Sequence, residues 1–196
     1  MTATDRTSVT PEEKQDRARK MMLWFGIASL IMTFAGWTSA YIVSSSREDW
    51  MTDFRLPPSF WISTGILLAS SLTYMLAVNA VRREKAQAAT IWLGVTLAAG
   101  LLFVYSQFRG FSEMIGYGYY FTGPTSNITL SFVFLIAAVH IAHVAAGLIS
   151  LVVVLVNQVR GRYGPGRMLG IELGATFWHF LDLLWLYLIL FFYFFK

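Results

Sequence analysis

The chain has 196 residues, of which 56% are hydrophobic and 13% charged, and its 15 Lys and Arg residues outnumber 11 Asp and Glu residues. This composition excludes a soluble domain with a polar surface. The chain has no cysteine, which excludes a disulfide framework, a thiolate metal site and a cysteine nucleophile. The basic excess lies at the ends of apolar runs, so it indicates membrane topology rather than nucleic-acid binding.

Residues 1–20 form a polar tail, so we expect no cleavable signal peptide. Within the tail, the run from Thr10 to Glu13 is typical of a helix start. Thr10 is the predicted N-cap, Pro11 the first helical residue, and Glu13 the acidic partner of a capping box. The tail therefore predicts a short cytoplasmic surface helix that leads into the membrane domain, residues 21–196.

Five apolar runs follow, and each is long enough to cross a bilayer as a helix. They predict an all-α, polytopic membrane protein that forms a five-transmembrane-helix bundle. The predicted spans are 21–43, 60–81, 88–108, 128–156 and 171–195.

Small and hydroxyl side chains suit the first, second and fourth spans for helix contacts. In the fourth span, Ala138, Ala142 and Ala146 are spaced by four and predict a small-residue seam. The loop at 116–124 is rich in Gly and aromatic residues, which indicates a structured interfacial segment. The hydroxyl residues of the second span can bond to other helices or to their own backbone; they are Ser63, Thr64, Ser70, Ser71 and Thr73.

Lys and Arg residues are unevenly divided between the two sets of predicted loops. One set holds Arg6, Lys14, Arg17, Arg19, Lys20, Arg82, Arg83, Lys85, Arg160, Arg162 and Arg167. The other set holds Arg47, Arg55, Arg109 and Lys196. Because cytoplasmic loops carry the basic excess, we expect a cytoplasmic N-terminus and a C-terminus outside.

Ionisable side chains are concentrated in the last two spans. His140 and His143 are three residues apart on one side of a helix, and Glu172 and His179, seven apart, also share a face. Asp182 lies a further three residues along. Charged groups at membrane depth usually face the inside of a bundle and pair there. These five residues therefore predict a buried polar cluster with a structural role.

Other chemistry is compatible with the same residues. The histidines and Glu172 could ligate zinc or iron, and a histidine from each of two spans could hold a haem. A proton relay needs groups at several depths, but the first three spans have no acid or histidine in their interiors. No nucleophile elbow, phosphate loop or Rossmann turn is present. We therefore expect no self-sufficient active site and a subunit of a larger assembly.

Two stretches closely resemble subunit III of the haem-copper oxidases. The run 178–186, Trp-His-Phe-Leu-Asp-Leu-Leu-Trp-Leu, resembles the Trp-His-Phe-Val-Asp-x-x-Trp-Leu of that family's last helix, and Glu172 matches a glutamate seven residues before the histidine. The run 140–147 is similar to the family's His-Gly-x-His-Val-x-x-Gly. Gln107 matches the glutamine of Gln-x-x-Glu-Tyr, and the run 67–71 is also similar. The resemblance covers about residues 21–196, in the five-helix bacterial form.

The sequence departs from the family at two acidic positions. Leu30 stands where much of the family has a membrane glutamate, and Gly110 stands where it has the glutamate of Gln-x-x-Glu-Tyr. Leucine cannot ionise. The resemblance therefore implies a divergent member with fewer buried charges and no proton-antenna role for the first span.

The resemblance implies a non-catalytic subunit of a proton-pumping terminal oxidase, with cytochrome c preferred as electron donor and quinol as the alternative. Haem and copper would lie in partner subunits, with no cofactor, metal or catalytic residue on this chain. It implies contacts with oxidase subunit I, other oxidase subunits and phospholipids in a bacterial inner membrane, and membership of a larger respiratory supercomplex is open. The polar cluster would lock the fourth span against the fifth. A stand-alone transporter or a haem- or metal-binding protein is the remaining alternative.

Overall fold

The computed structural model describes residues 10–51, 56–123 and 126–195, and these form five helices. The prediction of an all-α chain is confirmed for this part of the sequence. All five helices are long and apolar enough to cross a membrane. They are α1 (Pro11–Ser44), α2 (Pro58–Arg82), α3 (Ala86–Gly116), α4 (Ile128–Val159) and α5 (Leu169–Phe194).

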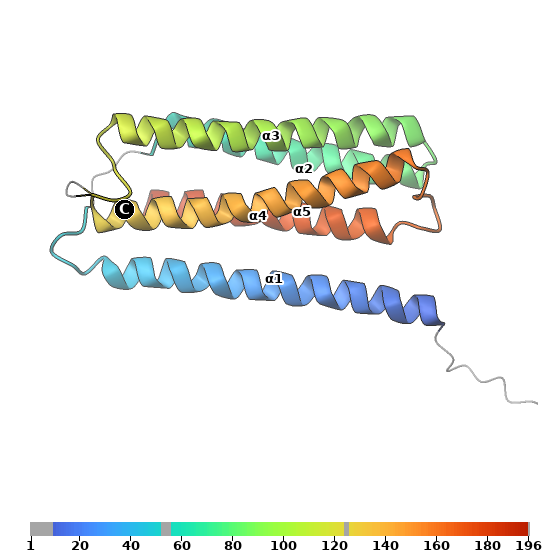
Figure 1. Ribbon diagram of the computed structural model, residues 1–196, viewed down its shortest axis with the longest axis horizontal. Helices are drawn as coiled ribbons and strands as arrows, with labels where there is room; N and C mark the ends of the chain where they lie inside the picture. Colours follow the sequence, from blue (N-terminus) through green and yellow to red (C-terminus); the bar gives the residue numbers. More distant parts are fainter. Residues whose placement is uncertain (1–9, 52–55, 124–125, 196) are drawn as a thin grey trace, which may run out of the picture.

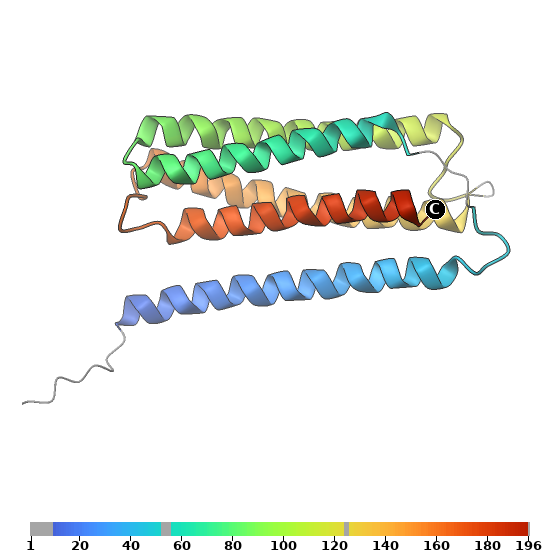
Figure 2. The same cartoon turned by 180° about the vertical axis from the view of Figure 1, so that it is seen from behind.

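The helices run up and down, so that successive helices are antiparallel (Figure 1). One end of the bundle holds the start of α1, the short α2–α3 turn and the α4–α5 connection; the other holds the end of α5. Among the described residues, α2 packs most extensively on α3, while α1 contacts only α4 and α5. Helix α1 therefore lies at the side of a four-helix body (Figures 1 and 2).

Helix α1 begins with the predicted capping box. The Glu13 N–H donates to Thr10 Oγ1 at 3.3 Å, and the Thr10 N–H donates to Glu13 Oε2 at 3.0 Å. The helix then continues without a break to Ser44, so the predicted surface helix and the first span are one element. Its buried apolar residues, Ile27, Phe34 and Tyr41, recur every seven positions. Only one stripe of α1 therefore faces the bundle.

Helix α3 extends two turns beyond the predicted span, from 108 to Gly116. Two polar side chains in this part of α3 face α2. The Gln107 amide donates to Ser63 Oγ at 2.8 Å, and Ser59 donates to the Glu113 carboxylate at 2.5 Å, so both bonds join α3 to α2.

The predicted alanine seam on α4 is wrong as a contact within the described chain, because all three alanines are exposed.

The connection that follows α1 is held to the start of α4. Asn127 Nδ2 donates to the Asp49 carbonyl at 2.8 Å, and the Met51 N–H donates to Thr129 Oγ1 at 3.0 Å. Arg47 donates twice to the Asp49 carboxylate, at 2.8 and 3.0 Å. This bond lowers the pKa of Asp49 below its ordinary value and raises the pKa of Arg47.

Candidate functional site

Four hydroxyl residues of α2 form what we call the hydroxyl column: Ser63, Thr64, Ser70 and Ser71. They comprise two pairs spaced by seven, so they lie along one side of the helix. Three of them donate to carbonyls of the preceding turn: Ser63 and Thr64 to Phe60 O, and Ser70 to Leu67 O. With its proton used in this way, each hydroxyl oxygen is free to accept from another helix.

Two indoles of α5 donate to the hydroxyl column. Trp178 Nε1 lies 3.0 Å from Ser70 Oγ, and Trp185 Nε1 lies 3.0 Å from Thr64 Oγ1. Both rings are almost fully buried, at 1% exposure. A buried Trp needs an acceptor for its N–H, so these bonds fix which side of α5 faces α2.

Glycines on two other helices make room for Trp178. A Cβ added at Gly100 of α3 would lie 2.7 Å from Trp178 Cη2, and one at Gly147 of α4 would lie 2.7 Å from Leu181 Cδ1 and 3.3 Å from Trp178 Cε3. The Trp178 ring therefore contacts α2, α3 and α4 together. It is the central packing element of the four-helix body.

His179 and Asp182 continue the polar contact between α5 and α2. The Ser71 hydroxyl lies 2.5 Å from His179 Nδ1. Asp182 is buried, at 3% exposure, and Ser71 also faces its carboxylate. Neither carboxylate oxygen has a hydrogen-bond partner of good geometry among the described residues. Ser71 is therefore the shared neighbour of the two ionisable groups.

Glu172 forms an ion pair with Arg82 at the end of α2, with Nη2 and Oε1 3.0 Å apart. The two side chains are 41% and 58% exposed, so this pair lies at the rim of the bundle. It borders a groove of about 460 Å³ between α2 and α5, which Asn79, Thr176 and His179 also line. Exposed pairs of this kind contribute little to stability, roughly 0–1 kcal/mol.

The two histidines of α4 have different surroundings. His140 is fully buried and stacks on Trp185 of α5, with ring centroids 5.1 Å apart. Neither of its ring nitrogens has a partner among the described residues. His143 Nδ1 lies 2.8 Å from the Val139 carbonyl of its own helix. The Phe34 ring of α1 makes edge contacts with both imidazoles.

The five predicted residues therefore do not form one cluster between α4 and α5. Glu172 and His179 contact α2, and the α4–α5 contact at His140 is ring stacking rather than a polar bond. Among the described residues, no group of three or more His, Asp or Glu side chains is placed to hold a metal ion.

Sequence reasoning found the polar residues of α5 but missed what they contact. Periodicity identifies which residues share a face, and the indole bonds then decide which helix that face meets. One signal was available: the pairs 63/70, 64/71 and 178/185 all have the same spacing of seven. Equal spacing on two helices allows one column of donors to meet one column of acceptors.

The sequence is similar to a known family and to several of its members. The model of the family described as "Cytochrome c oxidase subunit III" matches residues 51–196, which include α2 to α5. The cytochrome bo(3) ubiquinol oxidase subunit 3 of Pseudomonas aeruginosa is 35% identical over 132 residues, 66% of this chain and 60% of that protein. The match thus spans less than two thirds of that relative's length.

Two further relatives are covered more fully. The cytochrome c oxidase subunit 3 of Corynebacterium diphtheriae is 28% identical over 171 residues, 84% of this chain and 82% of that protein. A probable quinol oxidase subunit 3 of Staphylococcus aureus is 25% identical over 191 residues, 94% of this chain and 92% of that protein. Since the family model extends over α2 to α5, the chain belongs to the cytochrome c oxidase subunit III family.

Proposed function

We propose that the chain is the non-catalytic subunit III of a proton-pumping haem-copper terminal oxidase of aerobic respiration. The observation that carries the proposal is the family match over α2 to α5. The hydroxyl column of α2 accepts from the two indoles of α5, and Trp178 also packs against α3 and α4. The residues that the family model matches therefore include the whole packed four-helix body of this chain.

The side chains of the body support a scaffolding role. An unpartnered polar group in hydrocarbon costs several kcal/mol, so hydroxyl–indole bonds hold α2 and α5 in one register. The imidazoles of α4 and α5 contact different neighbours, Trp185 for His140 and Ser71 for His179. These contacts support a packing and hydrogen-bonding role for the two imidazoles.

The distribution of charge supports a cytoplasmic N-terminus. The end of the bundle that holds the start of α1 also holds the α2–α3 turn and the α4–α5 connection (Figure 1). Lys14, Lys20, Arg83, Lys85 and Arg162 lie at that end. Cytoplasmic loops carry the basic excess, so this end faces the cytoplasm of a bacterial inner membrane.

The outer surface suits both lipid and protein contacts. Along α1 and α5 an almost entirely apolar groove of about 430 Å³ is lined by Ile31, Phe34, Phe180, Leu183 and Tyr187, among others. It would hold acyl chains. Oxidase subunit I is the main partner in this proposal, with other oxidase subunits beside it.

Cytochrome c is the proposed electron donor of the complex. Quinol is the second candidate, which the 35% identity to a ubiquinol oxidase subunit specifically favours. Oxygen consumption by the purified complex with reduced cytochrome c, and separately with a quinol, decides between the donors.

The proposal is tested by purifying the tagged chain from its native membrane in a mild detergent. We expect it to co-purify with a large subunit that contains both haem and copper, identified by absorption spectrum, metal analysis and mass spectrometry. The chain separated from that subunit should show no haem band. Purification without a haem-copper partner, or a haem band on the separated chain, would contradict the proposal.

A further inference from the structure

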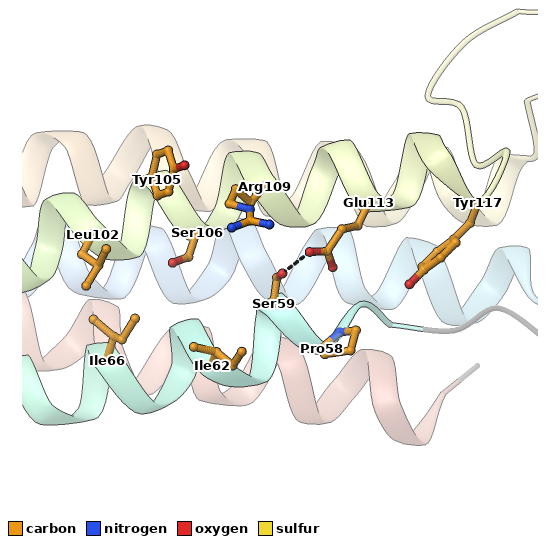
Figure 3. Close-up of a pocket in the computed structure, with 10 residues that line it drawn as sticks. All are labelled: Pro58, Ser59, Ile62, Ile66, Leu102, Tyr105, Ser106, Arg109, Glu113 and Tyr117. Carbon is orange, nitrogen blue, oxygen red and sulfur yellow. Dashed lines mark hydrogen bonds between the residues drawn. The ribbon is translucent and has the colours of Figure 1, made fainter.

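A groove of about 560 Å³ lies between the start of α2 and the second half of α3, at the end of the bundle opposite the N-terminus (Figure 3). It is separate from the α2–α5 contact described above. Its walls combine apolar and polar side chains: Pro58, Ser59, Ile62, Ile66, Leu102, Tyr105, Ser106, Arg109, Glu113 and Tyr117.

The groove is polar at one end and apolar at the other. Ile62, Ile66 and Leu102 line the end nearer the middle of the helices. Tyr117 is the C-cap residue of α3 and marks the end nearer the membrane surface. An amphipathic trough of this kind, with its axis along the helices, matches the shape of a phospholipid with its headgroup at the surface.

Two opposite charges face the polar end in a definite order (Figure 3). Arg109 is exposed and has no ion-pair or hydrogen-bond partner among the described residues. Glu113 accepts a hydrogen bond from Ser59 at 2.5 Å. Glu113 is one turn further along α3, about 6 Å closer to the helix end. A ligand would therefore meet the cation deeper in the membrane and the carboxylate nearer the water.

We propose that this groove binds a phospholipid that carries both a phosphate and a primary ammonium, that is, a phosphatidylethanolamine. Arg109 binds the phosphate, the Glu113 carboxylate accepts from the ammonium, and an acyl chain lies along Ile62, Ile66 and Leu102. In this headgroup the phosphate is nearer the glycerol and the ammonium nearer the water, which is the order of the two side chains. A lipid with an anionic phosphate alone would leave Glu113 facing it.

This inference deepens the lipid-holding part of the proposed function and names its ligand. It rests on that role but not on the identity of the partner subunit. The test therefore measures which lipid the chain prefers. The expected preference can be absent although the chain co-purifies with a haem-copper subunit, and it can be present although the chain does not co-purify with one.

The experiment is native mass spectrometry of the full chain titrated with lipids of equal acyl composition. On the unaltered chain, binding should fall along the series from phosphatidylethanolamine through its mono- and dimethyl forms to phosphatidylcholine, as N–H donors are lost. We expect roughly tenfold weaker binding at the end of the series, the equivalent of one charge-assisted hydrogen bond. Equal binding of all four lipids would overturn the proposal.

Two variants test the roles of the charges. Glu113→Gln should weaken phosphatidylethanolamine binding and leave phosphatidylglycerol binding unchanged or stronger. Arg109→Gln should weaken both, and Arg109→Lys should restore part of each. Arg47→Gln removes a cation from the exposed loop at the same end and is the matched control, with no loss expected. Equal losses of both lipids in Glu113→Gln, or no loss in Arg109→Gln, would overturn the assignment.

A photo-crosslinking amino acid in place of Leu102 identifies the occupant in the assembled complex. Crosslinking to phosphatidylethanolamine supports the proposal. Crosslinking to a protein chain would mean that a partner helix covers the groove, and the lipid assignment would then be wrong.

Discussion

Replacing Gly100 by alanine tests the packing around Trp178. The added Cβ would lie 2.7 Å from Trp178 Cη2 and 2.8 Å from Leu148 Cδ2, both well inside van der Waals contact. Leu148 can change rotamer, but the indole is rigid, buried and hydrogen-bonded to Ser70. The ring cannot move without breaking that bond or pressing on Gly147. We therefore expect the overpacking to lower the free energy of unfolding by about 1–3 kcal/mol.

Gly94 supplies the matched control, because it lies on the same helix and a Cβ there would meet nothing within 4 Å. Both substitutions gain the same intrinsic helix preference of alanine, up to about 1 kcal/mol. The difference between the two variants therefore isolates the clash. Unfolding in mixed detergent micelles, followed by helical circular dichroism, measures it. Equal stability of Gly100→Ala and Gly94→Ala would refute the close packing of Gly100 against Trp178.

The remaining predictions concern the polar contacts. His179→Leu should lower the free energy of unfolding by about 0.6–2 kcal/mol, because it removes the bond to Ser71. The haem spectrum of the oxidase should stay unchanged, and a shifted spectrum would mean that His179 acts on the redox centre. A double-mutant cycle of Trp185→Phe and Thr64→Val should give a favourable coupling energy of about 0.6–1.7 kcal/mol, and additive effects would exclude the indole bond. Because the pKa of Asp49 is lowered in the folded chain, its contribution to stability is complete above the ordinary Asp pKa and is lost as the pH falls through the lowered value. Arg47→Gln should return that pKa toward its ordinary range in an NMR titration of the Asp49 carboxyl, and an unchanged pKa would exclude the ion pair.

Local sequence signals predicted the elements of this fold well. The capping box at Thr10 and Glu13 is present, and each apolar run corresponds to a helix. Helix ends were less predictable where polar residues face another helix. The predicted third span ends at 108, just after Gln107, but Gln107 and Glu113 bond to Ser63 and Ser59 on α2 within a helix that continues to Gly116.

The partners of the ionisable residues could not be read from one helix at a time. The pattern in α5 places His179 on a face, but the rotation of α5 against its neighbours depends on two rings and their acceptors. Trp178 and Trp185 both require acceptors, and the hydroxyl column of α2 provides them. That requirement turns the polar face of α5 toward α2 rather than α4.

Gly110 shows how packing explains one departure from the family resemblance. A Cβ there would lie 2.7 Å from the Phe60 ring of α2, so the aromatic side chain fills the space that a larger residue at this position would need. The structure therefore leaves no room at position 110 for the glutamate that the family resemblance would place there.

If this chain is a supporting subunit, the redox chemistry of the oxidase lies in another subunit. The decisive experiment removes the chain from the purified complex, measures oxygen reduction over many turnovers, and then adds the chain back. We expect an unchanged haem spectrum and initial rate, with activity that decays faster until the chain is restored. Loss of a haem band together with the chain would contradict it.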